Sequence, residues 1–439
     1  MKAKWLSVCV LVLLMAVART VESQTLLTQT TWGGAGADVA DGVATAADGS
    51  SYVVGITDSF TVDQFGTPSP RIFLVKFASN GTLAWQRIWN GPTIRGLGRT
   101  GVAVGAGGSV YVTGLSVNNG NDAVLLKFDA NGTLLWERTW GGAATDNGAA
   151  VATDVDGSAY IVGTETSFGA SGRGLFVVKF DAAGNLVWQK IVDGTEGTAV
   201  AVAPDGNVYA AGTIPRDQLG NFNMLVLKIT ADGNLVWQRT YAAGSVADAR
   251  GGMAAAPDGS IVVAGALQSL KANTPDITAL ILALGADGSL TFDKQFDGKI
   301  SETGDGVTVA PDDGSIYVTG TTTTFGAGNQ DAFVLHLAST GKKLLDAVTW
   351  GGTQFETGAG VSVTGSTLVL AATTTAGPPY SLLPAAARLS LPHGTLSAAT
   401  AVLAVVAGTV ANPAAGAATP NGSTTFSGNF EAALVRIAR

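Results

Sequence analysis

Cysteine and histidine are almost absent from this sequence, which has one Cys and two His among 439 residues. That scarcity excludes most metal sites and most catalytic arrangements built on a thiol or an imidazole. Charge is scarce as well, since only 13% of the residues are charged and 33 acidic residues outnumber 25 basic ones. An acidic chain of this kind cannot neutralise a run of phosphates, so we expect no nucleic-acid partner. A hydrophobic fraction of 46% and a net charge of only -8 also exclude a disordered chain.

The N-terminus has the pattern of a secretory signal peptide. Two lysines precede an apolar run, Trp5–Val17, that is too short to span a membrane, and a weak cleavage site ends at Ser23. We therefore expect a signal peptide at 1–23 and a mature chain at 24–439 without a membrane span; a retained anchor is the alternative. Because Cys9 lies in the signal, the exported chain would contain no disulfide, which is typical of bacterial secreted proteins. The expected location is extracellular or on the cell surface, with the periplasm as the alternative.

Helical periodicity is missing throughout, whereas internal repetition is strong. A Gly-x-Leu-x-Trp ending recurs in four units, at Trp85, Trp136, Trp188 and Trp237. Trp-Gly-Gly opens units at Trp32, Trp140 and Trp350, and six units of about 53 residues fit between the first and the last of these openings. Each unit also contains an Asp-Gly or Gly-Gly turn into a strand, and an apolar strand that ends in a basic residue.

Each unit reads as four short strands joined by tight turns. Asn-Gly and Asp-Gly turns between β-branched runs predict hairpins, because these residues accept the positive φ that such turns need. One four-stranded antiparallel sheet cannot bury both of its faces, but many sheets packed radially can do so. The sequence therefore predicts an all-β fold, a single β-propeller of four-stranded antiparallel blades without an internal domain boundary.

The number of blades depends on the C-terminal region, where the repeat weakens. Leu368–Leu396 aligns without a gap with Ile316–Leu344, which places Leu389 in a third strand. Val402–Val410 resembles another second strand, and Asn429–Ile437 repeats the third-strand pattern. Dividing the mature length by the repeat length favours eight blades with a shortened last blade. Seven blades with an inserted hairpin is the alternative.

Closure of the ring is also predicted. Gln24–Trp32 matches the fourth-strand phase of Leu134–Trp140, whereas the chain ends after a third strand. We therefore expect the N-terminal strand to supply the outer strand of the last blade and so to close the propeller.

The repeated motifs resemble a known family. Trp-Gly-Gly, followed by Asp-Gly-Ser-x-Tyr-Val-x-Gly-Thr and by Phe-Val-x-Lys-Phe-Asp-x-x-Gly-x-Leu-x-Trp, is similar to the bacterial β-propeller repeats often called SBBP repeats. The resemblance covers Thr31–Trp350 and continues in weaker form to the C-terminus. It implies a bacterial exported or cell-surface propeller, and it carries no catalytic residue.

Acidic residues recur where each outer strand leads into the next inner strand, and in a propeller these connections gather around one mouth of the channel. The expected ring comprises Asp38, Asp146, Glu196, Asp248, Glu302 and Glu356, with Asp41 and Asp305 beside it. The second unit has Arg95 and Arg99 there instead, and the fifth adds Arg250. Such a ring could hold Ca²⁺ or a cationic ligand, and like-charge repulsion could raise the pKa of one carboxyl. The alternative, which we favour, is that the acids cap turns and keep the surface soluble.

The repeated aromatic and basic residues have structural interpretations. The Gly-x-Leu-x-Trp ending also looks like the repeats of quinoprotein dehydrogenases, which hold pyrroloquinoline quinone and Ca²⁺. Recurrence at one structural phase favours packing between blades instead, and we predict no cofactor. The third-strand lysines are expected to lie along the sheet with solvated heads. His336 and His393 have no nucleophile setting nearby, so no triad is expected.

The function that this pattern favours is a non-enzymatic, monomeric binding scaffold for an extracellular protein or glycan. The longer connections at Asp58–Arg71, Ile214–Asn223, Gln268–Ile277 and Gly377–Pro384 are the candidate binding loops. The alternative is a propeller enzyme, either a polysaccharide hydrolase or lyase or a quinoprotein-like oxidoreductase, using carboxylates at the channel mouth. Scarcity of His and Cys favours binding.

Overall fold

The computed structural model describes residues 25–375, apart from 63–65, 68, 94–98, 118–119, 216–220, 242–245, 270–275, 299 and 327–328. Beyond residue 375 it describes 381–384, 389–391, 394–395 and 431–438. The expected signal peptide at 1–23, the expected strand at Val402–Val410, Arg95 and His393 lie outside the described residues.

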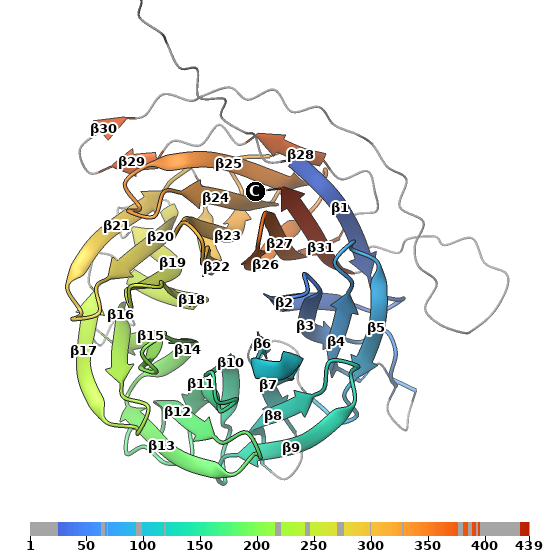
Figure 1. Ribbon diagram of the computed structural model, residues 1–439, viewed down its shortest axis with the longest axis vertical. Helices are drawn as coiled ribbons and strands as arrows, with labels where there is room; N and C mark the ends of the chain where they lie inside the picture. The colour runs from blue at the N-terminus through green and yellow to red at the C-terminus, as the bar shows by residue number, and fades with distance from the viewer. Residues whose placement is uncertain are drawn as a thin grey trace, which may run out of the picture.

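Seven antiparallel sheets surround a common axis, and each contains a blade of four strands, so the fold is a seven-bladed β-propeller (Figure 1). Blade 1 comprises β2 (Asp38–Thr45), β3 (Ser51–Thr57), β4 (Arg71–Phe77) and β5 (Leu83–Ile88), and blade 2 comprises β6 (Gly101–Val104), β7 (Val110–Ser116), β8 (Asp122–Phe128) and β9 (Leu134–Trp140). Blade 3 comprises β10 (Asn147–Thr153), β11 (Ala159–Glu165), β12 (Gly174–Phe180) and β13 (Leu186–Asp193), and blade 4 comprises β14 (Glu196–Val202), β15 (Val208–Pro215), β16 (Phe222–Ile229) and β17 (Leu235–Tyr241). Blade 5 comprises β18 (Val246–Ala255), β19 (Ile261–Ser269), β20 (Asp276–Leu284) and β21 (Leu290–Phe296), and blade 6 comprises β22 (Glu302–Val309), β23 (Ile316–Thr322), β24 (Asp331–Leu337) and β25 (Leu344–Gly351). Blade 7 comprises β26 (Glu356–Thr364), β27 (Thr367–Thr374), β31 (Glu431–Ala438) and β1 (Thr25–Trp32). A short 3-10 helix, η1 (Ala106–Gly108), joins β6 to β7, and β28 (Ser381–Pro384), β29 (Leu389–Leu391) and β30 (Gly394–Thr395) lie outside the blades.

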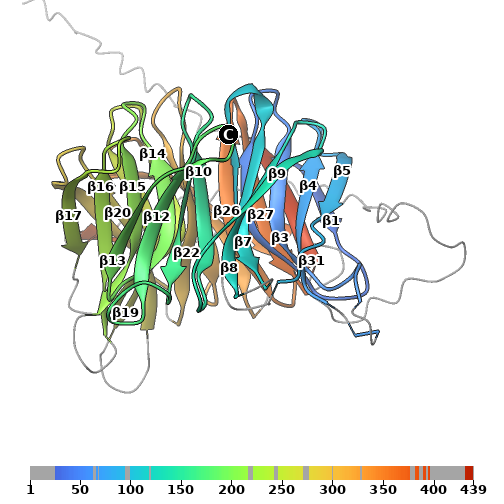
Figure 2. The same cartoon turned by 90° about the horizontal axis from the view of Figure 1, so that it is seen from below.

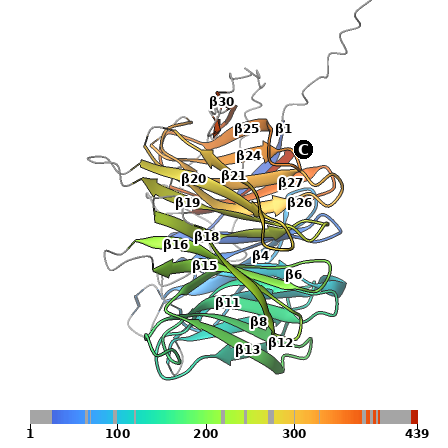
Figure 3. The same cartoon turned by 90° about the vertical axis from the view of Figure 1, so that its left-hand side faces the viewer.

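The strands run between two faces of the ring, as the edge-on views show (Figures 2 and 3). Hairpins that join the first to the second strand and the third to the fourth lie on one face, here called the turn face. The other connections, within and between blades, lie on the opposite face, here called the loop face. Turn-face glycines have a positive φ, for example 78° at Gly157 and 85° at Gly184, which residues with a Cβ rarely adopt. These hairpins confirm the turns that the Asn-Gly and Asp-Gly pairs predict.

The expectation of eight blades is wrong. The last blade has its second strand at β27, as the internal alignment predicts, but its third strand comes only at β31. Between them, β28 pairs with the outer strand β25 of blade 6, and β29 pairs with the outer strand β21 of blade 5. Leu389 therefore lies outside blade 5 and not in a third strand. The division of the mature chain length by the repeat length had counted this inserted segment as an eighth blade.

Blade 7 contains both ends of the described chain. Its third strand, β31, follows the pattern predicted at Asn429–Ile437, and its outer strand is β1. The two strands pair antiparallel from Thr25 opposite Ala438 to Trp32 opposite Ala432. Strands from the two ends of the chain thus form half of one sheet.

Seven apolar clusters fill the seven spaces between neighbouring blades. The middle strands contribute to two clusters at once, and every residue of β3 and of β7 is buried. Because a strand that is buried on both faces has few sites where a charge is tolerated, this architecture accounts for the low charge content.

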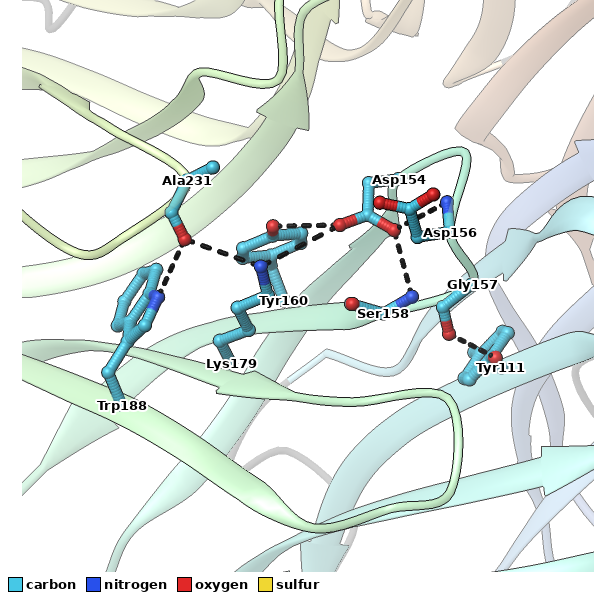
Figure 4. A network of polar contacts seen from close by, with 9 residues as sticks. All are labelled: Tyr111, Asp154, Asp156, Gly157, Ser158, Tyr160, Lys179, Trp188 and Ala231. Atoms are coloured by element: carbon cyan, nitrogen blue, oxygen red, sulfur yellow. Dashed lines mark hydrogen bonds and ion pairs between the residues drawn. The ribbon is translucent and has the colours of Figure 1, made fainter.

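Four of the seven junctions share a set of polar contacts, here called the clasp, and Figure 4 shows the one between blades 3 and 4. At the junction between blades 3 and 4, Trp188 Nε1 and Lys179 Nζ both donate to the carbonyl oxygen of Ala231, at 2.9 and 3.3 Å. The Lys179 ammonium also lies 5.0 Å from the ring centroid of Tyr160, a cation–π distance. Equivalent clasps join blades 1 to 2, 2 to 3 and 4 to 5, with the carbonyl oxygens of Ala130, Ala182 and Ala286 as acceptors.

The clasp confirms that the repeated tryptophans join neighbouring blades. It also shows that the expectation of solvated lysine heads is wrong, because each ammonium is bound by the next blade and Lys228 is only 8% exposed. The remaining three junctions lack the lysine. In blades 5, 6 and 7 its position is occupied by Ala283, His336 and Arg436, which pair in register with Phe292, Asp346 and Thr28 on the outer strand.

Candidate functional site

The first strands of all seven blades surround the axis of the propeller (Figure 1), and residues of these strands line its central channel. Residues on or next to these strands line a cavity of about 160 Å³. That volume is below the range of roughly 300–1,000 Å³ that is usual for small-molecule pockets. Glycines bring the inner backbones together, since a Cβ on Gly306 would lie 2.9 Å from the Cα of Gly360.

β-Bulges aim charged side chains into this channel. The pairing of β2 with β3 skips Asp41, and the pairing of β22 with β23 skips Asp305. A bulge redirects the side chain of the extra residue, and both aspartates line the cavity. The equivalent positions in β10 and β26 hold Ala149 and Ala359, so only some of the blades place a charge at the bulge.

Arg99 bridges the channel between blades that are not neighbours. Its Nη2 lies 3.0 Å from Oδ1 of Asp305 in blade 6, while the adjacent Thr100 donates through N and Oγ1 to Asp41 in blade 1. Burial works against the charge on Arg99, but Asp305, Asp41 and Asp248 outweigh burial and raise the pKa of the guanidinium. Arg99 therefore stays cationic and closes part of the channel.

Further charges lie around the same mouth. Arg250 Nε lies 3.5 Å from Oδ2 of Asp248, and Arg173 Nη2 lies 2.6 Å from Oε1 of Glu196. Burial raises the pKa of Asp248, and the charge of Glu196 adds to this effect although Arg250 opposes it. Charges of both signs thus surround the channel mouth. We call the following residues the mouth cluster: Asp41, Arg99, Glu196, Asp248, Arg250 and Asp305.

The other four acids of the expected ring are fully buried and bind the backbone. Asp146 accepts hydrogen bonds from Gly142 N at 2.7 Å, from Thr166 N at 3.0 Å and from Ser167 Oγ at 2.6 Å. Asp38, Glu302 and Glu356 do the same, since each accepts from the backbone N–H four residues earlier and from a threonine hydroxyl at the end of the second strand. These four residues cap turns, as the favoured alternative predicts. The structure therefore brings only Glu196 and Asp248 of the expected six to the mouth cluster.

Two Trp-Gly-Gly junctions each hold a second carboxyl group beside the capping acid. A Cβ on Gly141 would lie 2.2 Å from Asp122 Oδ1 and 2.7 Å from Asp146 Oδ2, so these oxygens are close neighbours. Burial raises the pKa of Asp122, and the charge of Asp146 adds to this effect. Around Gly351, Asp331 and Glu356 form the equivalent pair, and burial, together with the Asp331 charge, raises the pKa of Glu356.

Other candidate residues lie elsewhere. His336 stacks on Tyr317, with ring centroids 4.4 Å apart, in the clasp position between blades 6 and 7. Within the described part of the chain, no three His, Cys, Asp or Glu residues lie close enough together to hold a metal ion. The same part contains no helix long and apolar enough to span a membrane.

The four candidate loops all leave the loop face, because each follows the second strand of its blade. Each of them includes residues outside the described part of the chain. The loop face therefore combines the variable connections with the mouth cluster, as expected from the topology.

Sequence reasoning missed the roles of Asp122 and Asp331. Both open a third strand, opposite Ser116 and Thr322 at the end of the second strand, and Glu431 has the same register opposite Thr374. An acid at this position precedes the Trp-Gly-Gly openings at Trp140 and Trp350, and that coincidence in the repeat was the available signal.

Comparison with known proteins gives a fold likeness only. No family model matches the chain, and no curated protein matches it. Among solved structures, the WD40 domain of Pan2 from Neurospora crassa is 10% identical with a TM-score of 0.47, and the match covers 80% of this chain and 92% of that one. The β-propeller domain of the Trilobed protease from Pyrococcus furiosus is 10% identical with a TM-score of 0.46, covering 82% and 96%. Puromycin hydrolase is 16% identical with a TM-score of 0.43, covering 79% and 51%.

Proposed function

We propose that this chain is a non-enzymatic binding scaffold whose loop face holds a segment of an extracellular protein or a glycan around the mouth of the channel. The observation that carries the proposal is the bridge between Arg99 and Asp305. It spans blades 2 and 6 and leaves a cavity of only about 160 Å³. A ligand on this face meets a rigid rim of side chains and not a deep pocket.

The enzyme alternative has less support from the geometry. Glycoside hydrolysis needs two carboxyl groups that face a substrate from opposite sides. The close carboxyl pairs, Asp122 with Asp146 and Asp331 with Glu356, lie beneath the Trp-Gly-Gly turns, where Asp146 and Glu356 are fully buried. Asp305 at the mouth is already paired with Arg99. A carboxylate pair that reaches a bound polysaccharide is therefore not part of our proposal.

The ligand chemistry follows from the mouth cluster. Its carboxylates and guanidiniums offer hydrogen-bond acceptors and donors side by side, which suits the hydroxyls of a glycan or a mixed-charge peptide. Because the acidic residues of the sequence suggest Ca²⁺ binding, the proposal includes a Ca²⁺ ion that would bridge the ligand and the carboxylates of the mouth cluster.

We also propose that the chain is an exported bacterial protein of the SBBP type and acts outside the cytoplasm as a monomer. The support is the signal-like N-terminus, the absence of cysteine after Cys9 and the repeat motifs. Secretion of the full chain, with removal of residues 1–23, is the measurement that tests this part.

Ring closure by β1 is a further part of the proposal. The pairing of β1 with β31 supports it, because this ladder joins the first described strand to the last blade. Deleting 24–31 from the mature chain should lower the melting temperature of the whole propeller in one cooperative step. A deletion variant that melts like the parent chain would rule closure out.

The experiment for the binding function is a screen of glycans and surface proteins with the mature chain, with and without Ca²⁺. Hits are then measured with an Arg99→Met variant and with a turn-face control, Asp258→Asn, whose carboxylate only caps its own turn. Binding that falls at least tenfold with Arg99→Met and stays unchanged with Asp258→Asn supports the loop-face site. Turnover of a glycan by the mature chain would favour the enzyme instead.

A further inference from the structure

The junction between blades 7 and 1 differs from the clasped junctions in a way that points to a ligand. In blades 1 to 4, a tyrosine, a lysine and a tryptophan stand side by side on the second, third and fourth strands, as Tyr111, Lys127 and Trp136 do. In blade 7 the same register holds Val369, Arg436 and Thr28. Two aromatic rings are thus replaced by small side chains, while the cation is kept.

Arg436 faces blade 1. Side chains alternate along a strand, and Ala432 and Leu434 belong to the cluster between blades 7 and 1, whereas Ala433 and Val435 belong to the cluster between blades 6 and 7. Arg436 therefore shares the side of Leu434 and lies in the slot where blades 1 to 4 place the clasp lysine.

Two buried polar atoms at this position have no hydrogen-bond partner among the described residues. Arg436 is only 6% exposed, and its Nε has no hydrogen-bond partner among the described residues. Thr28 Oγ1, directly opposite in the ladder, is buried and also without a partner in that part of the chain. Unmade hydrogen bonds of buried groups are costly, and most of all for a charged group.

The junction between blades 3 and 4 shows which groups can satisfy such a cation. Lys179 has the Ala231 carbonyl oxygen, the Tyr160 ring and, at 3.8 Å, the Asp154 carboxylate of its own first hairpin. The first hairpin of blade 7, 364–367, contains no acidic residue. Desolvation without a compensating partner accordingly lowers the pKa of Arg436.

The turn of blade 1 completes the slot. A Cβ on Gly81 would lie 2.5 Å from Thr28 Oγ1, and Thr30 Oγ1 donates to the Gly81 carbonyl oxygen at 3.2 Å. The slot therefore lies where β31, β1 and the Asn80-Gly81 turn meet, at the junction that contains both chain ends.

We propose that Arg436 and Thr28 form a binding site for a small oxyanion, a phosphate or a carboxylate, at the junction between blades 7 and 1. Guanidinium and hydroxyl groups are the donors that such anions prefer in proteins. The bound anion would take the position that the Asp154 carboxylate has beside Lys179, and it would join β31 and β1 to blade 1. The ring would then be stabilised by its ligand, because an anion that binds only the folded state raises the melting temperature.

The test is a titration of the mature chain with inorganic phosphate, and separately with acetate, at constant ionic strength. Melting temperature and the heat of binding are both measured. We expect a saturable rise in melting temperature with at least one of the anions. The anion that acts identifies the ligand as of phosphate or of carboxylate type.

Two variants and a control assign the site. Arg436→Met should abolish the rise, and Thr28→Val, which keeps the charge, should weaken binding several-fold. Lys228→Met removes the cation at the same position of blade 4, where the Ala286 carbonyl oxygen already satisfies it, and should leave the anion effect intact. If Arg436→Met does not fold, Thr28→Val and the binding heat decide. No anion effect on the parent chain, or an equal effect in Arg436→Met or Thr28→Val, would overturn the proposal.

Discussion

The two faces of this propeller use the same residue type for opposite purposes. On the turn face, aspartates cap their own hairpins: Asp258 accepts from Ser260 N and Oγ, and Asp48 accepts from Ser50 in the same way. These hydrogen bonds lower the pKa of both carboxyls. On the loop face, burial raises the pKa of Asp122, Asp248, Glu302 and Glu356.

This difference between the two faces indicates which of them is suited to bind a ligand. In Asp48 and Asp258 on the turn face, one carboxylate oxygen accepts both hydrogen bonds of its own turn, so the group stabilises its own hairpin. The loop face combines buried acids, paired charges of both signs and connections that differ from blade to blade. An acidic composition alone does not distinguish these two situations, whereas the position of each acid in the repeat does.

The largest expected effect is on the loop face, at Asp146. Replacing it by Ala leaves the N–H groups of Gly142 and Thr166 without their buried acceptor, which should cost about 3 kcal/mol of unfolding free energy. Denaturant unfolding measures the loss. Asp146→Asn, which keeps one acceptor oxygen, should lose less than half as much, and equal losses in the two variants would contradict this reading.

A change of opposite sign is expected at the neighbouring Asp122. Because its pKa is raised in the folded state, ionisation of Asp122 at neutral pH destabilises the fold relative to the protonated form. Asp122→Asn should therefore raise the melting temperature at pH 7 by about 1 °C. The gain should vanish below the ordinary pKa of 3.8, where the parent carboxyl is protonated in both states. A loss of stability at pH 7 would show that the carboxylate is needed there.

The acids of the two faces should also affect stability in different ranges of pH. Groups with a raised pKa, such as Glu302 and Glu356, bind protons on folding, so stability should increase as pH falls from neutral towards their ordinary value of 4.5. Groups with a lowered pKa, such as Asp48 and Asp258, stabilise the fold above their ordinary value of 3.8, and this contribution is lost as pH falls further. Melting temperatures measured from pH 8 to pH 3 should pass through a maximum at mildly acidic pH. A steady fall from pH 7 downwards would contradict the assignment of the raised groups.

The smallest effect is expected on the turn face. Asp258→Ala removes one cap from a hairpin whose Gly259 already has a φ of 80°, so the melting temperature should fall by about 1 °C. The second measurement is amide hydrogen exchange at Ser260, and the exchange rate should increase in this hairpin alone. Exchange that increases in the channel strands would mean that the turn face is coupled to the mouth.

The sequence predicts the blades well because each repeat contains the turn residues and the strand patterns of one blade. Gly157 and Gly184 mark turns that only a positive φ allows, and Trp188 marks a junction between blades. It predicts the blade count poorly, because β28 and β29 carry strand-like patterns but pair outside blades 6 and 5. Pairing partners of short apolar segments are decided by tertiary packing, not by local pattern.

The site was predictable only in part for a similar reason. The position of Glu196 and Asp248 at the channel mouth follows from the repeat phase. Burial of Asp146 depends on Gly142 and Ser167 and on how the Trp-Gly-Gly turn folds over the next blade. The bridge from Arg99 to Asp305 joins residues 206 positions apart and is a property of the closed ring alone.

The most direct measurement for the loop-face account is the affinity of a screened protein or glycan for three forms of the mature chain: the parent, Arg99→Met and Asp258→Asn. We expect at least a tenfold loss of affinity with Arg99→Met, measured at a temperature at which all three forms are folded, and no change with Asp258→Asn. Affinity that falls with Asp258→Asn and not with Arg99→Met would place the ligand on the turn face and contradict the account.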